Sequence, residues 1–444
     1  MSEIIVTGHR NPDFDSICSA AAYAAMKNIS DPENSYIPVR CGHLSANTKK
    51  VLDKLGVESP PYQKDVYPKV SDVMLTGGEL LDADAPLSEL AKTYKPTNPS
   101  VAPVFRDGKF AGLISIDDIT AWTMSQLAQC SESGAAFPCA IPKIGEIMGR
   151  QEAPLQIGDM FDDAKAALTA SMLRGLAVFD GEEFRGYVIR RCFLKKPRNQ
   201  VIMVDHNEAG QSIRGIETAD VVGIIDHHRL DSVKTDLPIM IDTEPLGSTC
   251  TIVYRHYRRK GLLPDPQTAK TLLTGITSDT LILRSPTTTQ VDIDSVKELA
   301  ELCGVDHERF GREMFSEMES LGSQDPEEAI RSDFKEYCEH GVRFGIGQCE
   351  VTTLSDVGEY YTVYRDTLET VKTGKSLDWA LLMITDVLRE KSLLLCTGYK
   401  AERSLPYSAL PDAPGKIYDM PGVMSRKKQL LPEIIHSLAL ISNL

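Results

Sequence analysis

The sequence predicts an α/β protein with a doubly wound parallel sheet, an inserted module and a smaller α/β domain at its C-terminus. Three observations predict this fold. The strand-like run "EIIVTG" precedes a polar loop and the alanine-rich helical pattern "SICSAAAYAAMKN", which together form half of a βαβ unit. Later strand-like runs, "VIMV" and "VVGII", also end in acidic or histidine residues. A long segment with two similar halves separates the first unit from these later runs.

The length and composition indicate a soluble protein with several domains. At roughly 100–200 residues per domain, the 444 residues form about two to four domains. Hydrophobic residues make up 42% of the chain, and no apolar run reaches the roughly 18 to 20 residues of a membrane span. The start of the chain does not resemble a signal peptide, and the ten cysteines include no C-x-x-C pair. The sequence therefore predicts a cytoplasmic protein with reduced thiols and no membrane partner.

The net charge of −15 argues against broad, non-specific binding of nucleic acid. A small anionic substrate can still bind where metal ions and a local basic cluster outweigh that charge. The overall charge therefore excludes a general nucleic-acid partner and leaves phosphate chemistry open.

The first polar loop is "TGHRNPDFDS", residues Thr7 to Ser16. It places His9, Asp13 and Asp15 within seven positions. Asp15 or Ser16 could simply be the N-cap of the following helix. Two carboxylates beside an imidazole would repel one another without a cation, so this set favours a metal site.

Three further segments repeat this design. "VIMV" ends in Asp205, His206 and Asn207, and "VVGII" runs into Asp226, His227 and His228. In "LLTGITSDTLILRSP", Asp279 follows another apolar run. Because ligands of parallel sheets bind beyond the carboxyl ends of the strands, these four segments predict one crevice.

The types of side chain narrow the choice of metal. Carboxylates and imidazoles without cysteine suit manganese, cobalt or magnesium better than structural zinc. Several aspartates also allow one carboxylate to bridge two ions. Two such ions can hold a hydroxide between them and clamp a phosphoryl group, which predicts hydrolysis of a phosphorus–oxygen bond.

The motifs resemble a known superfamily. "DHHR" at Asp226 to Arg229, with "GHRNPDFDS" and "VDHNE", resembles the DHH phosphoesterase superfamily. The C-terminal "MSRKKQLLPEI" is similar to the signature of the family II inorganic pyrophosphatases. The resemblance implies pyrophosphate as substrate, a tight pair of Mn²⁺ or Co²⁺ ions, and Mg²⁺ that accompanies the substrate.

The same resemblance implies a role for each matching residue. His9 and Asp13 would bind one ion, Asp15, His227 and Asp279 would bind the second, and Asp205 would bridge the pair. His228 would contact the substrate and protonate the leaving phosphate, while the role of His206 stays open. Ser425, Arg426 and Lys427 would bind pyrophosphate.

The family also implies a substrate-binding lysine in the segment "RSDFKEYCEHGVRFGIGQ", and Lys335 is the candidate. The alternative is an ordinary solvated lysine on the surface. Lys335, Arg426 and Lys427 would all lie in the C-terminal domain, so we expect pyrophosphate to bind between two domains.

The interrupting segment contains two copies of one pattern. "KVSDVML" and "KIGEIMG" begin the copies, with Val73 and Ile147 lying 74 positions apart (147 − 73). Each copy is expected to form helix, strand, turn, strand and helix, which resembles a CBS domain. A CBS pair implies binding of AMP, ADP or ATP and assembly as a homodimer; a purely structural pair is the alternative.

Within the copies, the resemblance points to three nucleotide-binding residues. "GLISIDDI" places Ser115 and Asp118 where CBS motifs contact phosphate and ribose. The second copy has Arg190 and Arg191 where the acid is expected, and Arg190 could contact phosphate instead.

The expected domain order follows from these assignments. Residues 1–65 and 197–318 would form the DHH catalytic domain, 66–196 the CBS pair, and 319–444 the substrate-binding domain. "MESLGSQDPEEA" at 318–329 would be a hinge.

These expectations together predict a manganese- or cobalt-dependent inorganic pyrophosphatase that an adenine nucleotide regulates. Two alternatives lie in the same superfamily: a short-chain polyphosphatase and a phosphodiesterase acting on small nucleotides. A third, a non-catalytic CBS nucleotide sensor, belongs to another class; the complete set of candidate ligands argues against it.

Overall fold

The computed structural model describes residues 2–77, 81–93, 100–133, 141–149, 153–231, 234–316, 321–351, 353–386, 389, 391–411, 413 and 415–442. Residues 1–66 and 199–444 form one compact unit, and residues 67–198 form a second. The domain division expected after residue 318 lies outside the described residues.

The first unit contains the parallel sheet that the sequence predicts. Its strands follow the order β11-β10-β9-β1-β2, and every neighbouring pair is parallel. The strands are β1 (Ser2–Thr7), β2 (Asn34–Val39), β9 (Gln200–Val204), β10 (Asp220–Asp226) and β11 (Met240–Thr243). All their carboxyl ends therefore meet at one edge, which is where polar loops can converge.

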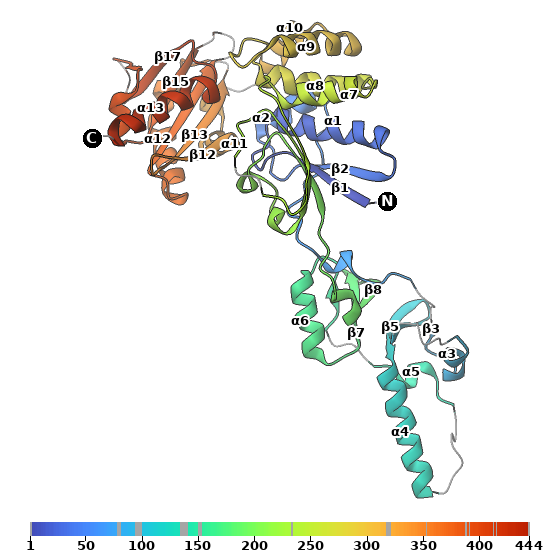
Figure 1. Cartoon of the computed structure of the whole chain (residues 1–444). Helices are drawn as coiled ribbons and strands as arrows, with labels where there is room; N and C mark the ends of the chain where they lie inside the picture. Colours follow the sequence, from blue (N-terminus) through green and yellow to red (C-terminus); the bar gives the residue numbers. More distant parts are fainter. Residues whose placement is uncertain are drawn as a thin grey trace. The chain divides into compact units, whose positions relative to one another are not determined.

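The two faces of this sheet are covered differently. Helices pack on one face, where Figure 1 shows α1, α7 and α8 alongside one another. Helices α1 (Phe14–Ser30) and α7 (Thr249–Arg259) contact the strands. The same core continues into α2 (Ala46–Leu55), α8 (Pro266–Asp279), α9 (Gln290–Cys303) and α10 (His307–Ser316), of which α8, α9 and α10 pack against other helices. The core of the other face includes Ile213 and Ile216, from a connection with the short turns η3 (Ala209–Gln211) and η4 (Ile216–Thr218). A short connection from β9 to β10 leaves no room for a long helix there.

One element differs from the sequence-based expectation. Asp279 ends helix α8, whereas the repeated design suggested that it follows a strand. Leu272, Leu273 and Ile276 are fully buried at helical spacing. The helix begins with Asp265 as N-cap and a proline in its first turn, a strong start signal.

A second, mixed sheet forms the C-terminal part of the first unit. Its order is β12-β13-β14-β15-β17-β16, with β13 and β14 parallel and the other neighbours antiparallel. Its elements are α11 (Pro326–Ser332), β12 (Phe334–Glu339), β13 (Val342–Val351), α12 (Val357–Gly374), β14 (Trp379–Asp386), β15 (Lys391–Cys396), β16 (Ser408–Ala409), β17 (Ile417–Pro421) and α13 (Leu431–Ser442). Every residue of the central strand β14 is buried, between separate cores on the two faces.

The second unit reproduces the 74-residue repeat. One sheet contains β3 (Leu81–Asp82), β4 (Val101–Arg106) and β5 (Lys109–Ser115); the other contains β6 (Leu155–Gln156), β7 (Gly175–Asp180) and β8 (Glu183–Ile189). Helices α3 (Leu87–Thr93), α4 (Ile116–Ser133), α5 (Ile144–Ile147) and α6 (Phe161–Ser171) accompany them. The equivalent rings of Phe110 and Phe184 stack on each other at 4.4 Å between centroids.

The leading segments of the two copies, residues 69–75 and 143–149, are exchanged between the copies. Val70, from the first leading segment, packs in the core around Leu155, whereas Ile144, from the second, packs in the core around Leu81. Equivalent bridges join Leu75 to Tyr187 and Gly149 to Leu113. Each copy therefore completes the core of the other, which the linear pattern of the sequence did not reveal.

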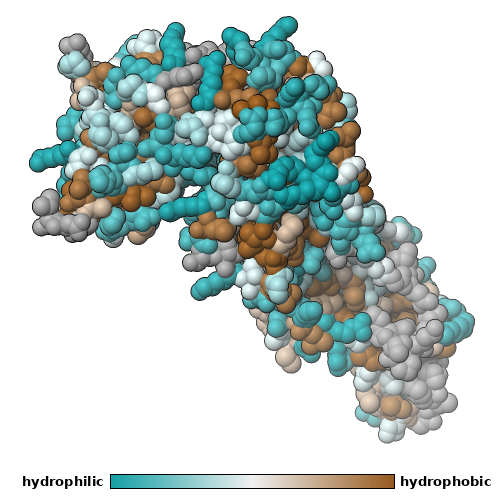
Figure 2. Space-filling view, turned by 45° about the horizontal axis from the view of Figure 1, so that its top comes forward, coloured by the Kyte–Doolittle hydropathy of each residue, from teal (hydrophilic) through white to brown (hydrophobic). Residues whose placement is uncertain are grey.

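Among the described helices, none combines the length and the apolar character needed to cross a lipid bilayer. Figure 2 shows hydrophilic residues interspersed with smaller hydrophobic groups on the visible face.

Packing in the C-terminal sheet predicts a difference between two glycine substitutions. A Cβ at Gly345 would lie 2.2 Å from the Phe334 ring, so Gly345→Ala should lower the free energy of unfolding by about 1–3 kcal/mol. Gly374, in the last turn of α12, has no atom within 4 Å of such a Cβ, and Gly374→Ala should be neutral or slightly stabilising. Thermal unfolding of the two variants measures the difference, and equal Tm values would contradict this packing.

Candidate metal centre

The loop after β1 is fixed by its own side chains. Asp13 is the N-cap of α1, and its Oδ1 accepts a hydrogen bond from the Ser16 N–H at 2.9 Å. The Ser16 hydroxyl in turn accepts a hydrogen bond from the His9 N–H at 3.0 Å. A Cβ at Gly8 would lie 2.0 Å from that hydroxyl, so this close approach requires glycine. The capping residue is therefore Asp13, and Asp15 is free of that role.

Asp15 is fully buried and points at the N-terminus of α7. Its Oδ1 accepts hydrogen bonds from the Ser248 hydroxyl (2.6 Å) and the Cys250 N–H (3.0 Å), and its Oδ2 accepts one from the Thr249 N–H (2.7 Å). A helix N-terminus stabilises a carboxylate, so these groups hold Asp15 in place. These partners of Asp15 were not predicted from the sequence, although Ser248 is a recognisable N-cap.

Asp205 lies between the two histidines at the strand ends. Its Oδ2 is 3.3 Å from His9 Nε2, and its Oδ1 is 3.5 Å from His227 Nε2. The residue has a φ of 60°, a left-handed conformation that is uncommon for a residue with a side chain. Its N–H donates to the Ile225 carbonyl at 2.9 Å, and its Oδ1 accepts from the Thr249 hydroxyl at 3.0 Å. This conformation turns the carboxylate into the crevice.

Asp279 and His227 complete the second side of the crevice. His227 Nε2 lies 3.4 Å from Asp279 Oδ2. The other ring nitrogen, Nδ1, lies 3.1 Å from the Leu246 carbonyl, to which it can only donate. This contact fixes the tautomer and leaves the Nε2 lone pair facing the carboxylates.

Three groups of side chains have donor atoms within 4.8 Å of one another: His9, Asp13 and Asp205; Asp15, His227 and Asp279; and Asp205, His227 and His228. The two imidazole nitrogens that face the carboxylates, in His9 and His227, are buried and make no hydrogen bond with any described residue. Unpartnered imidazole nitrogens beside carboxylate oxygens fit a metal ion. With no thiol among them, the donors suit manganese or cobalt.

The electrostatics of the crevice also fit a cation. Burial, followed by the charges of Asp15 and Asp13, raises the pKa of Asp205 to about 8. Burial and the same two charges raise the pKa of Asp279 well above its usual value. Carboxylates crowded in this way resist ionisation unless a positive charge lies among them.

His228 is oriented by a residue to which the sequence analysis gave no role. Asp226 is fully buried, and its Oδ1 accepts a hydrogen bond from His228 Nδ1 at 2.8 Å. Asp226 is held by the Asn207 side-chain amide, which donates to its Oδ2 at 2.6 Å. His228 Nε2 therefore faces Lys335, whose Nζ lies 3.0 Å away. The position of Asp226 at the end of a strand was visible in the sequence, but its partner was not.

His206 lies behind the donor groups. Its Nδ1 is 2.8 Å from the Val204 carbonyl, and its ring meets the His9 ring edge-on at 6.4 Å between centroids. Burial lowers the pKa of His206 to about 4, which keeps its ring neutral. The structure does not include His206 in any of the three donor groups.

The basic residues expected to bind the substrate lie in the C-terminal part, on strand β12 and on the turn that follows β17. Arg426 Nη2 pairs with Asp333 Oδ1 at 2.9 Å, and Nη1 donates to the Asp333 carbonyl at 2.7 Å. Lys427 Nζ donates to the His227 carbonyl at 2.8 Å. The contact of Lys335 with His228 places its ammonium at the crevice and rules out an ordinary solvated position on the surface. Ser425 is the N-cap of the turn that carries Arg426 and Lys427.

Several of the metal-type donors and the basic residues line one cavity of about 220 Å³. Asp13, His227, His228 and Asp279 line it from the parallel sheet and its loops; Lys335, Ser425, Arg426 and Lys427 line it from the C-terminal part. The structure thus brings metal-type donors and cations together in one site. This arrangement can bind a small, strongly anionic ligand next to a metal ion.

Two of the nucleotide-binding candidates in the second unit, Ser115 and Asp118, lie in one hydrogen-bonded turn. Asp118 Oδ2 accepts hydrogen bonds from the Ser115 N–H (2.7 Å) and the Ser115 hydroxyl (2.6 Å). In the second copy, Cys192 Sγ accepts from the Ile189 N–H at 3.5 Å in the equivalent place. The repeat therefore pairs Asp118 with Cys192. Arg190 and Arg191 are then the counterparts of Ile116 and Asp117, because the strands of the two copies pair in the same register.

Comparisons with known proteins agree with this geometry. Residues 3–276 match the N-terminal domain of the DHH family, and residues 312–436 match the DHHA2 domain. A cobalt-dependent inorganic pyrophosphatase of Clostridium perfringens is 28% identical, over 97% of each chain. A manganese-dependent inorganic pyrophosphatase of Methanothrix thermoacetophila is 36% identical, over 53% of this chain and 76% of its own.

A crystal structure from Methanococcus jannaschii, assigned to the family II inorganic pyrophosphatases, has the same fold, with a TM-score of 0.61 and 24% identity over 98% of this chain and 99% of its own. The chain therefore belongs to the DHH family and, within it, to the manganese- or cobalt-dependent inorganic pyrophosphatases, which are hydrolases.

Proposed function

We propose that the chain hydrolyses pyrophosphate to two orthophosphates. The observation that supports this most strongly is the position of Asp205, whose two carboxylate oxygens face His9 and His227 separately. One ion would be held by His9, Asp13 and Asp205, and a second by Asp15, Asp205, His227 and Asp279. When bound, Mn²⁺ or Co²⁺ in these sites would supply an acidified water and positive charge for a phosphoryl group.

The basic residues of the C-terminal part bind and orient the substrate. Arg426, Lys427 and Lys335 neutralise the charge of pyrophosphate, and Mg²⁺ accompanies it. Ser425 fixes the turn on which two of these cations lie. Arg426 Nη1 donates to the Asp333 and Ile346 carbonyls, and Nη2 donates one of its two N–H groups to Asp333 Oδ1. The second Nη2 donor and the buried Nε, which has no partner among the described residues, are then available to the substrate.

His228 delivers a proton to the departing phosphate. Its Nδ1 is bound to Asp226, so Nε2 is the nitrogen that faces the cavity. Burial and the charges of Lys335 and Lys427 lower the pKa of His228, so the neutral ring carries no proton on Nε2. The Lys335 ammonium, whose Nζ lies 3.0 Å from Nε2, would supply the proton that His228 passes to the leaving oxygen.

We further propose that the second unit is a pair of CBS domains that binds AMP, ADP or ATP and regulates hydrolysis in a homodimer. The duplicated βββ arrangement, the exchanged leading segments and the Ser115–Asp118 turn support this proposal. Asp118 would contact the ribose and Ser115 the phosphate, with Arg190 as a further phosphate contact. Regulation requires that the nucleotide binds two arrangements of the pair with different affinity.

The bridging role of Asp205 predicts the effect of one substitution. Asp205→Asn keeps an oxygen that can accept from the Thr249 hydroxyl but removes the shared charge. Phosphate release from pyrophosphate, measured with Mn²⁺ or Co²⁺ and excess Mg²⁺, should fall by about a thousandfold or more. Asp220→Asn, at the amino end of β10, is the matched control and should keep full activity.

Substantial turnover by a folded, metal-loaded Asp205→Asn enzyme would contradict the bridging role. The same assay with tripolyphosphate and a dinucleotide distinguishes the proposed activity from its relatives. Faster hydrolysis of either one than of pyrophosphate would assign the chain to a polyphosphatase or a phosphodiesterase instead.

The nucleotide proposal predicts that the two copies are not equivalent. Asp118→Ala should abolish the change in pyrophosphate hydrolysis caused by AMP or ATP, because the carboxylate of the Ser115 turn is lost. Cys192→Ala, at the equivalent position of the second copy, should keep the response. Titration of activity with each nucleotide measures this, and a normal response in Asp118→Ala would refute the assignment.

A further inference from the structure

The basic residues that line the cavity are Lys335, Arg426 and Lys427, and they define its basic end. Lys335 contacts His228, Lys427 contacts the His227 carbonyl, and Arg426 pairs with the carboxylate of Asp333, which lines the same end. Away from them, the described lining includes Asp325 and Glu328 and no lysine or arginine. A phosphate chain that extends past the basic end therefore meets carboxylates.

Helix α11 connects the basic end to these carboxylates. Asp333, directly after this helix, holds Arg426 and so fixes the C-terminal end of α11 at the basic residues. One face of α11 follows the cavity wall. The residues of the helix and its N-cap that line the cavity have the i, i+3, i+4, i+7 spacing of a single helix face: Asp325, Glu328, Ala329 and Ser332. Glu328 thus lies one helical turn, about 6 Å, further from the basic end than Ser332.

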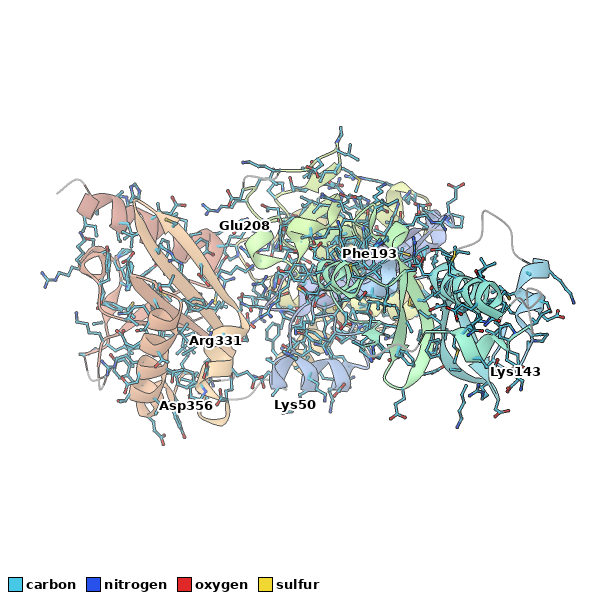
Figure 3. The ribbon with its side chains drawn as sticks, turned by 90° about the horizontal axis from the view of Figure 1, so that it is seen from below. Lys50, Lys143, Phe193, Glu208, Arg331 and Asp356 are labelled. Carbon is cyan, nitrogen blue, oxygen red and sulfur yellow. The ribbon has the colours of Figure 1, made fainter. Side chains whose placement is uncertain are left out.

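The Glu328 side chain binds the N-terminus of another helix, α2. Its Oε1 accepts a hydrogen bond from the Ala46 N–H of α2 at 2.6 Å. Figures 1 and 3 show α2 and α11 as neighbours, with Lys50 marking α2 and Arg331 marking α11 in Figure 3. Free N–H groups at a helix N-terminus attract phosphate. Here a carboxylate of the protein occupies that position, and the Ser45 hydroxyl occupies the Thr48 N–H.

We propose that Glu328 is a specificity-determining residue that restricts the site to diphosphate. A third phosphoryl group would extend along α11 and meet the Glu328 carboxylate, and it would find the N-terminus of α2 already bound. Asp325, whose Oδ1 accepts from the Glu328 N–H at 2.9 Å, adds a second negative charge beside it. This inference rests on the proposed pyrophosphate hydrolysis and names what limits the length of the substrate.

Glu328→Gln tests the proposal because it keeps an oxygen for the Ala46 N–H and removes only the charge. The matched control is Glu327→Gln on the same helix, where the carboxylate pairs with Arg331 at 2.8 Å and does not line the cavity. The full-length enzyme with Mn²⁺ and Mg²⁺ is assayed for kcat/KM with pyrophosphate and with tripolyphosphate. The ratio of tripolyphosphate to pyrophosphate should rise about tenfold in Glu328→Gln and stay unchanged in Glu327→Gln.

A charge effect also has a salt dependence that a purely structural contact lacks. The difference in this ratio between Glu328→Gln and the unmodified enzyme should therefore shrink as ionic strength rises, because salt screens the Glu328 charge that only the unmodified enzyme carries. If Glu328→Gln does not fold, Asp325→Asn provides the same two measurements. A ratio equal to that of the unmodified enzyme at every ionic strength, with pyrophosphate still hydrolysed, would overturn the inference alone. Failure of the unmodified enzyme to hydrolyse pyrophosphate would overturn the proposed function and this inference together.

Discussion

The crowding of four carboxylates into one buried crevice is the constraint on which the rest of the structure depends. Asp13, Asp15, Asp205 and Asp279 meet beyond the carboxyl edge of the parallel sheet. Burial and the neighbouring carboxylates raise the pKa of Asp15, Asp205 and Asp279, whereas His9 keeps the pKa of Asp13 below its usual value. Bound cations would relieve this repulsion, so the same residues that destabilise the metal-free crevice create its affinity for metal.

Much of the surrounding structure holds these acids in place despite their repulsion. The N-terminus of α7 binds Asp15, the capping of α1 fixes Asp13, and the left-handed backbone at Asp205 turns its side chain inward. The C-terminal part contributes the cations Lys335, Arg426 and Lys427 to the same cavity. Metal-type donors and cations in one small cavity suit a compact polyanion.

The fold and most of the site could be predicted from the sequence because they depend on local patterns. An apolar run followed by a polar loop predicts a strand, and it also predicts that the loop residues lie at the carboxyl end of that strand. This is why the sequence alone could assign His9, Asp205 and His227 to one crevice. Asp279 was placed in the crevice correctly but on the wrong element, since a short apolar run does not distinguish a strand from a buried helix.

Features that depend on contacts between distant segments could not be predicted. The pairing of Asn207 with Asp226 and of Asp333 with Arg426 leaves no periodic signal in the sequence. The contact between Glu328 and Ala46 joins residues 282 positions apart. In the repeat, the sequence showed two similar copies but not that each leading segment packs in the core of the other copy. The match of Cys192 with Asp118 follows from the 74-residue offset, and the hydrogen bonds of the two turns agree with it.

Centrally, we propose that the Asp205 carboxylate is shared by two metal ions. The most direct test is the electron paramagnetic resonance spectrum of the enzyme titrated with Mn²⁺. We expect two ions per chain and a spin-coupled signal, because a shared carboxylate holds the ions close together. A single bound ion, or two ions with the six-line spectrum of isolated Mn²⁺, would contradict the claim.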